Sequence, residues 1–100
     1  MKRRTSGVQR SFTLKHVPDS VAERNFLEAA DVLAEIPGVQ HFRKLRQTSA
    51  KSDFAFGFSM AFSDLDAYEH YNDHPWHVSF VNEHWTPEVL RFMEFDYVPL

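Results

Sequence analysis

Four of the six histidines lie close together in the second half of the chain, at His70, His74, His77 and His84. An imidazole titrates near neutral pH, so a histidine that borders a cavity can remove a proton next to a carbonyl group. His77 fits this role best, because helical spacing places it on the same face as the apolar Phe80 and Val81. It is the candidate general base, and the alternative is a core histidine that bonds a backbone carbonyl or Asp96.

Two neighbouring residues could support His77. Tyr71 lies one helical turn before His74, where its phenol could orient a substrate oxygen or pack as a buried ring with a satisfied hydroxyl. His74 precedes Pro75, so its side chain could cap the second half of the helix, lie beside a ligand, or simply mark the break.

The same histidines, with Glu69 and Glu83 beside them, include the residue types of a zinc site. Pro75 interrupts the helical spacing from His70 to His74, and His70 falls outside the apolar stripe. Solvated histidines are therefore favoured over a zinc site, and neither a metal nor a cofactor is expected.

The remaining candidate lies on a strand. Apolar and polar residues alternate over residues 8–16, which predicts a strand with one largely apolar face, and Arg10 is the exception on that face. Arginine stays protonated and cannot act as a base, although it can bind a carboxylate or stabilise an enolate. The alternative is an ion pair with Asp96 or another carboxylate.

The first of two predicted helices follows this strand. Ser20, with Glu23 three residues later, indicates a helix that begins near Ser20, and the Pro37-Gly38 pair ends it. Its predicted inner stripe consists of Ala22, Phe26, Ala29, Ala30, Leu33 and Ile36.

The second helix carries the histidines. Ser63, with Asp66 at the matching position, indicates where it starts. It breaks at residues 74–75, where the proline suits the first turn of a new helix, and it closes at residues 86–87.

Three further strands are predicted over residues 39–47, 54–62 and 89–98. The alternation breaks in the first of them, which indicates a bulge or an edge position. The second has large side chains on one face and small ones on the other, so both faces should be covered. The helices can cover one face, and a partner sheet could cover the other.

The order strand, helix, strand, strand, helix, strand is the plan of an α+β, ferredoxin-like β-α-β-β-α-β subunit. Such a sheet leaves one face open, and a second copy stacked on it would complete a dimeric α+β barrel. The chain is predicted to be a single domain over residues 1–100, with residues 1–6 a flexible tail, and to pair with itself as a homodimer.

Composition excludes several classes of partner. The net charge is −3, and the basic residues are scattered apart from Lys2, Arg3 and Arg4, so neither nucleic acid nor a membrane surface is an expected partner. No stretch of eighteen apolar residues is present, as a membrane-spanning helix would need. The absence of cysteine fits a reducing compartment, and the cytoplasm is the expected location.

Several short motifs, in this order, resemble the stress-responsive A/B barrel domain (Dabb) family. They are Ile36-Pro37-Gly38-Val39, Gly57-Phe58, Phe62-Ser63, His74-Pro75-Trp76-His77-Val78 with Phe80-Val81, and Phe95-Asp96-Tyr97. The resemblance implies a ferredoxin-like subunit, a dimeric α+β barrel and a cavity between helices and sheet. The family includes stress-induced proteins and a plant polyketide cyclase that uses no cofactor or metal.

The resemblance also assigns residues. His77 matches the family's helix histidine, which resembles the base of the cyclase, and Tyr71 matches a tyrosine in its pocket. Asp96 belongs to the matching final motif, where its carboxylate could orient an imidazole. Arg10 is the departure, because the cyclase has a histidine at that place, which puts a mechanism with two histidines in doubt.

Two functions follow. The first is a stress-responsive Dabb homodimer with a pocket for a small apolar ligand, bordered by His74, Asp96, Phe80 and Val81. The alternative is a cofactor-independent cyclase-like or lyase-like enzyme, in which His77 is the general base, Tyr71 positions the substrate and Arg10 holds its acidic end.

Overall fold

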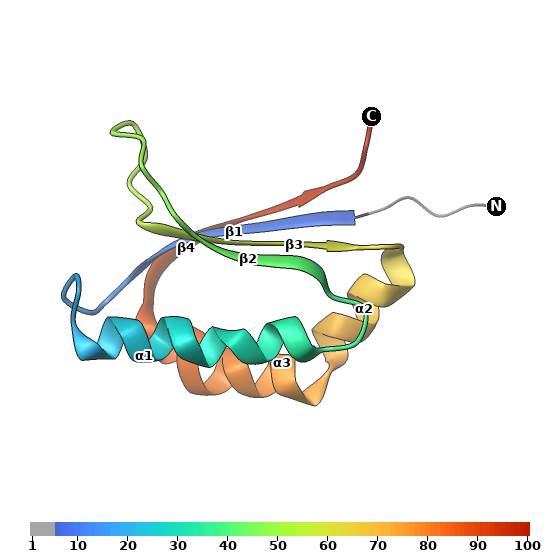
Figure 1. Ribbon diagram of the computed structural model, residues 1–100, viewed down its shortest axis with the longest axis horizontal. Coiled ribbons are helices and arrows are strands. Elements are labelled where there is room, and N and C mark those ends of the chain that lie inside the picture. The colour runs from blue at the N-terminus through green and yellow to red at the C-terminus, as the bar shows by residue number, and fades with distance from the viewer. Residues whose placement is uncertain (1–5) are drawn as a thin grey trace.

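A computed structural model describes residues 6–100 and arranges them as a sheet with helices packed on one of its faces (Figure 1). The elements in chain order are β1 (Ser6–Leu14), α1 (Val21–Ala29), η1 (Ala30–Glu35), β2 (Gln40–Arg46), β3 (Phe56–Phe62), α2 (Leu65–Asp73), α3 (Pro75–Phe80), η2 (Val81–Trp85), α4 (Thr86–Glu88) and β4 (Val89–Tyr97). The predicted order β-α-β-β-α-β is therefore confirmed.

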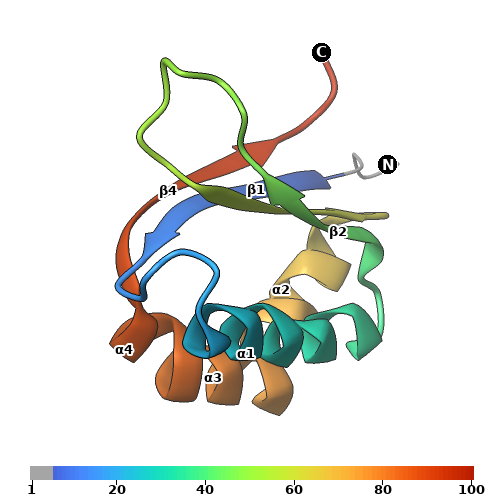
Figure 2. The same cartoon turned by 60° about the vertical axis from the view of Figure 1, so that its left-hand side comes forward.

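The sheet is antiparallel throughout, with the strand order β2-β3-β1-β4. Because side chains alternate along a strand, one face of each strand points toward the helices. On β1 this face carries the buried Val8, Phe12 and Leu14, with Arg10 between them. In the turned view of Figure 2, the helices lie beneath this face, and none of the helices and strands within residues 6–100 forms a layer over the other face.

Aromatic residues make up half of the buried hydrophobic core of the described residues. The rings of Phe12 and Phe58, which come from neighbouring strands, have centroids 4.7 Å apart. Phe26 of α1 packs on both, at 5.7 Å from Phe12 and 6.2 Å from Phe58. Rings in these offset and tilted arrangements stabilise a core beyond the apolar area that they bury.

The first helix begins as the sequence predicted. Ser20 is its N-cap, and the Ser20 Oγ accepts a hydrogen bond from the amide of Glu23 at 3.2 Å. The Glu23 carboxylate in turn accepts from the amide of Asp19 at 3.2 Å, which gives the buried Glu23 a partner. Ala22, predicted on the inner stripe, is exposed. Other members of that stripe, Phe26, Ala30, Leu33 and Ile36, are buried.

The helix ends at the predicted place, although its last part is the 3-10 segment η1. Gly38 follows with a φ of 94°, a left-handed conformation that glycine adopts without a side-chain clash. A Cβ at this position would lie 3.4 Å from the Cβ of Ala67. The turn therefore needs glycine for its backbone angle, whereas the distance to Ala67 is close to an ordinary van der Waals contact.

The second helix starts one residue later than predicted. Asp64, and not Ser63, is the N-cap of α2, and its Oδ1 accepts from the amide of Ala67 at 2.8 Å. The predicted break is confirmed, since His74 has extended backbone angles and α3 begins at Pro75. The His74 Nδ1 accepts from the amide of Trp76 at 3.1 Å, so His74 caps α3 as the sequence suggested.

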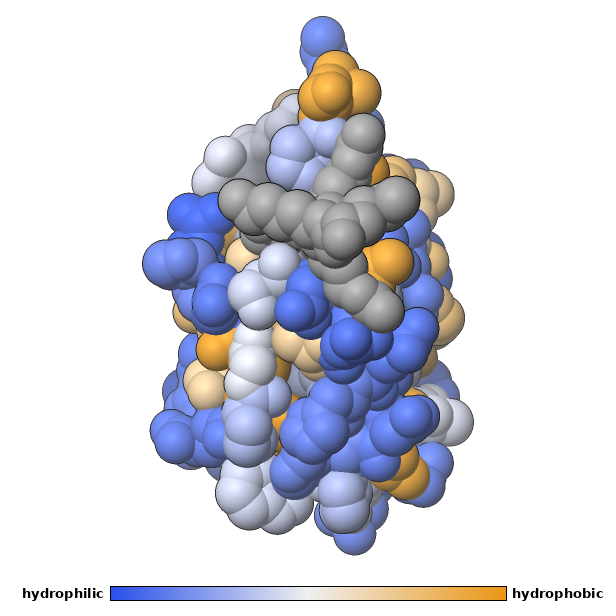
Figure 3. Space-filling view, turned by 90° about the vertical axis from the view of Figure 1, so that its right-hand side faces the viewer, coloured by the Kyte–Doolittle hydropathy of each residue, from blue (hydrophilic) through white to orange (hydrophobic). Residues whose placement is uncertain are grey.

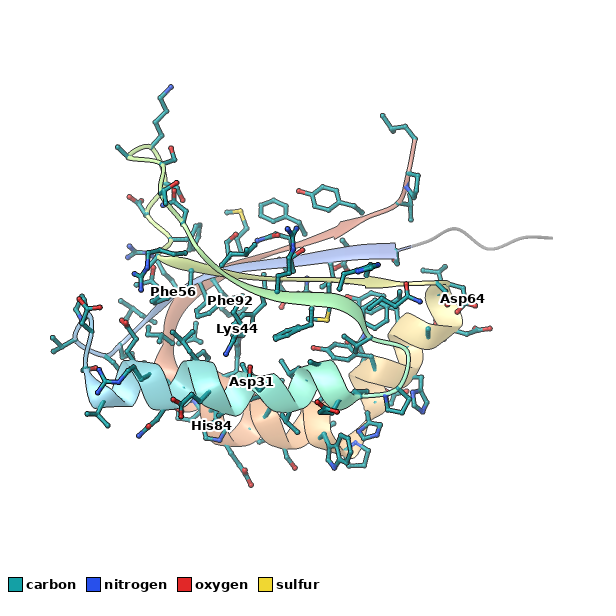
Figure 4. The ribbon with its side chains drawn as sticks, viewed as in Figure 1. Asp31, Lys44, Phe56, Asp64, His84 and Phe92 are labelled. Carbon is teal, nitrogen blue, oxygen red and sulfur yellow. The ribbon has the colours of Figure 1, made fainter. Side chains whose placement is uncertain are left out.

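The strand predicted over residues 39–47 is the edge strand β2, and its pairing with β3 is irregular between Gln40 and Arg43, as expected. Lys44 points from this strand toward α1 and η1, where its Nζ lies 2.7 Å from a carboxylate oxygen of Asp31 (Figure 4). The ion pair links the edge of the sheet to the helix layer.

Ser6, which was predicted to belong to the tail, is already part of β1, and the rest of that predicted tail lies outside the described residues. Figure 3 shows the end of the molecule that includes α2, where hydrophilic residues predominate and hydrophobic ones form small separate patches. None of the helices within residues 6–100 has the length and apolar character to cross a membrane.

Candidate functional site

A cavity of about 460 Å³ lies between the helix-facing side of the sheet and the helices α3 and η2. Most of its wall is apolar and includes the rings of Phe58, Phe80, Trp85 and Phe92. Phe92 comes from the end of the sheet where β4 begins, and it projects between the two layers (Figure 4). The polar side chains on the wall are those of Arg10, Tyr71, His77, Thr86 and Glu94. Cavities of this kind, apolar with a few polar groups, are typical of small-molecule sites.

The break between α2 and α3 positions His77 on the cavity wall. The His77 Nδ1 lies 3.0 Å from the backbone carbonyl oxygen of Asn72. A carbonyl can only accept, so Nδ1 carries the hydrogen and, in the neutral ring, Nε2 has the free lone pair. Burial lowers the pKa of His77, and the Asn72 hydrogen bond opposes this only in part. His77 is therefore a neutral imidazole with an available proton acceptor.

Tyr71 lies against His77, with ring centroids 4.5 Å apart. Its side chain is buried, and its other aromatic neighbour is Phe62 at 5.2 Å. Burial raises the pKa of Tyr71 well above its ordinary value, so the phenol keeps its proton. The cavity wall thus presents a proton acceptor and a hydroxyl donor side by side.

Arg10 borders the cavity, but its charge is already paired. One terminal nitrogen of Arg10 lies 3.0 Å from Asp96 Oδ1, and the other donates to the hydroxyl of Tyr68 at 2.9 Å. The Tyr68 hydroxyl donates in turn to Asp96 Oδ2 at 2.9 Å, which closes a ring of hydrogen bonds between β1, α2 and β4. Burial alone would lower the pKa of Arg10, but these partners raise it. The predicted alternative, an Arg10–Asp96 ion pair, is the arrangement found.

Glu94 is a wall residue that the sequence analysis did not select. It lies directly opposite Arg10 in the β1–β4 register, and its carboxylate is 3.9 Å from the Arg10 Nε. Its side chain is 55% exposed, so it lies at the mouth of the cavity. The alternation of residues 89–98 could have placed it on the face of Asp96, but its proximity to Arg10 depends on the strand register.

The other predicted residues divide into two groups. Phe80 and Val81 contribute to the cavity wall, together with His77, Tyr71 and Arg10. Asp96 bonds Arg10 and Tyr68 behind the wall, and His74 caps α3, so neither is part of the wall. Tyr68, which joins Asp96 to Arg10, was not predicted.

The remaining histidines of the cluster lie elsewhere. His70 is exposed on α2. His84 and His16 each contact a different oxygen of the Glu88 carboxylate, at 2.9 and 2.7 Å. Within residues 6–100 there is no cluster of three or more histidine, aspartate and glutamate side chains that could hold a metal ion.

The sequence of this chain matches one known protein family. The model of the stress responsive A/B barrel domain family, Dabb, matches residues 10–99. The chain belongs to the Dabb family. A Dabb protein with a ferredoxin-like fold from Mesorhizobium loti is 52% identical and covers 98% of this chain and 99% of its own, with a TM-score of 0.95.

More distant structures share the fold of this Dabb domain. A dimeric ferredoxin-like protein of unknown function from Thermobifida fusca is 16% identical, with a TM-score of 0.80 over 99% of this chain and 94% of its own. Hydroxynitrile lyase from Passiflora edulis is 12% identical, with a TM-score of 0.85 over 97% of this chain and 94% of its own. At these identities the likeness shows the fold alone. No curated protein matches the Dabb chain.

Proposed function

We propose that this Dabb protein is a homodimer that binds a small apolar molecule in the cavity between its sheet and helices. The observation that carries the proposal is the cavity of about 460 Å³ itself, in which aromatic walls surround the adjacent polar groups of His77 and Tyr71. The transfer of an apolar ligand from water into the cavity would be favourable in free energy. One oxygen atom on the ligand could contact both polar groups, His77 and Tyr71. A cytoplasmic location is part of the proposal.

The face of the sheet away from the helices supports the dimer. On β4 this face carries Met93, Phe95 and Tyr97, whose exposed fractions are 48%, 36% and 56%. On β3 it carries the small residues Gly57, Ser59 and Ala61. Large residues on one strand and small ones on another would let a second sheet approach closely. Dimeric proteins among the structures with this fold are consistent with such an arrangement.

Tryptophan fluorescence gives a direct test of the ligand site. The chain has two tryptophans, and Trp85 is on the cavity wall whereas Trp76 is 47% exposed. In a Trp76→Phe background, benzylacetone, a small aromatic ketone, should change the emission of Trp85 in a saturable way. The added Val81→Phe substitution should weaken binding, because Val81 is on the wall and the larger ring would fill the cavity.

The matched control is Val78→Phe, since Val78 is 45% exposed and outside the wall. This control should bind benzylacetone like the parent. No saturable change in Trp85 emission, or equal affinity of the Val81→Phe and Val78→Phe variants, would contradict the proposed site.

A second candidate function is proton abstraction next to a carbonyl, without a cofactor. The observation in its favour is the His77–Asn72 hydrogen bond, which leaves the His77 Nε2 as a proton acceptor on the wall. Tyr71 would donate to the carbonyl oxygen of the substrate. Arg10, predicted to hold an acidic end of the substrate, is paired with Asp96, so its role in this scheme is to support the wall.

Hydrogen exchange tests the second function. The protein should accelerate exchange of the hydrogens beside the carbonyl of benzylacetone in heavy water, as followed by proton NMR. His77→Gln should remove this acceleration, and His70→Gln should leave it intact because His70 is exposed on α2. If the ketone binds but its exchange is not accelerated, the site binds without catalysis.

A further inference from the structure

We propose that the cavity selects its ligand by charge, favouring amines over carboxylates, and that Glu94 sets this preference; the inference rests on the ligand site proposed above. It concerns the charged side chains at the sheet side of the cavity, which are Arg10 and Glu94 on the wall and Asp96 behind it.

The positive charge on this wall is already compensated. Arg10 forms an ion pair with Asp96 at 3.0 Å, and its terminal nitrogens also donate to the Tyr68 hydroxyl and to the backbone carbonyls of Gln9 and Phe95. Two carboxylates therefore face one guanidinium, because Glu94 approaches the Arg10 Nε at 3.9 Å. The three groups together leave one negative charge in excess.

The ionisable groups on the helix side of the cavity add no positive charge to compensate this excess. His77 and Tyr71, the ionisable groups on that side, are both neutral at neutral pH, since burial lowers the pKa of His77 and raises that of Tyr71. The wall and Asp96 behind it therefore have together one net negative charge, and Glu94 near the mouth is the carboxylate that a ligand can reach.

This distribution discriminates between ligands of equal size. A carboxylate in the cavity would place a third anion near one guanidinium, whereas an ammonium group beside Glu94 would find an opposite charge. Glu94 is 55% exposed, so water and salt screen much of the effect. We therefore expect about a tenfold difference in affinity between an amine and a carboxylate.

Three probes with one skeleton test the inference: phenylbutylamine, phenylbutanol and phenylbutanoate. They are titrated against Trp85 emission in the Trp76→Phe background at neutral pH and low salt. The expected order of affinity is amine, then alcohol, then carboxylate, and the spread should narrow as salt is added. The variant Glu94→Gln should bring the three affinities close together.

Two further variants test whether the order of affinities depends on the charges at the cavity or on the net charge of the whole protein. Glu35→Gln makes the same change on an exposed residue outside the wall and should keep the original order. Asp96→Asn frees the Arg10 charge and should raise the affinity for phenylbutanoate, provided that circular dichroism shows a folded variant.

The outcomes distinguish the two proposals. Binding of phenylbutanol with equal affinities for the amine and the carboxylate, or a Glu94→Gln variant that keeps the original spread, would overturn the charge selection and leave the ligand site standing. Failure of all three probes to bind would overturn the ligand site and the inference with it.

Discussion

The Nδ1 of His77, in α3, and the backbone carbonyl of Asn72, in α2, are joined by a hydrogen bond of 3.0 Å that crosses the proline break. The bond fixes the orientation of the imidazole and decides which of its nitrogens can accept a proton. It exists because Pro75 ends the regular bonding of α2, so that a carbonyl near the helix end is left for a side chain. The break between α2 and α3 thus determines how the His77 ring is oriented in the site.

His77 should make stability depend on pH. Its pKa is lowered in the folded protein from an ordinary value of 6.5, so the unfolded chain takes up a proton at a higher pH than the folded one. The contribution is fully present above pH 6.5 and decreases as the pH falls through that value toward the folded pKa. Urea unfolding on either side of pH 6.5 should show this slope, and His77→Gln should reduce it.

The control is His70→Gln, which replaces an exposed histidine on α2 and should keep the slope of the parent. All samples need one protein concentration, because the stability of a dimer depends on it. An unchanged slope in His77→Gln would show that His77 is protonated equally in both states.

Tyr68→Phe should destabilise the fold by about 1 kcal/mol. The Tyr68 hydroxyl both accepts from Arg10 and donates to Asp96, so its removal breaks two bonds of the ring that joins β1, α2 and β4. Tyr71→Phe is the matched control, because the Tyr71 hydroxyl forms no hydrogen bond with another of the described residues. The urea midpoints should separate the two variants, and equal midpoints would argue against the ring as a stabilising contact.

The N-cap of α2 can be tested by two neighbouring substitutions. Asp64→Ala should cost about 1 kcal/mol, because the Asp64 carboxylate satisfies the amide of Ala67. Ser63→Ala should cost much less, since Ser63 is exposed and lies before the cap. Thermal unfolding of both variants measures the difference, and a larger loss for Ser63→Ala would move the cap back to the residue that the sequence suggested.

The proposed dimer predicts the effect of a charge on the open sheet face. Phe95→Asp should shift the protein toward monomer in sedimentation velocity, because an aspartate there would be buried between two sheets. Val21→Asp places the same charge on the helix layer, at a residue that is 62% exposed, and should leave the dimer intact. A parent protein that sediments as a folded monomer would contradict the dimer.

The sequence predicted the elements well because their periodicities are long and clear. Helix ends marked by one strong signal, such as Ser20 or Pro75, were placed correctly. The start of α2 was missed because Ser63 and Asp64 are both good capping residues, and it is the hydrogen bond from the Ala67 amide to the Asp64 carboxylate that identifies Asp64 as the cap.

The site was predicted less completely, because its contacts join elements that are far apart in sequence. Helical spacing was enough to place His77 and Phe80 on one wall. The roles of Tyr68 and Glu94 depend on the docking of α2 and on the register of β4 against β1, which no local pattern encodes. The pairing of Arg10 with Asp96 was foreseen as an alternative since buried charges need partners.

The alternation of β4 has a consequence for changes in chain length. Thr13 pairs with Arg91 and Leu14 with Val89, so Leu90 is the extra residue of a bulge. Deleting Leu90 would remove the bulge and leave the pairing of the later residues with β1 unchanged, so Phe95 and Glu94 would keep their faces. Deleting Met93, in the regular part of the ladder, would instead turn Phe95 toward Arg10 and Glu94 toward the open face. A single-codon deletion at the bulge is therefore a mild change, whereas one further along β4 would damage the cavity and the pairing surface together.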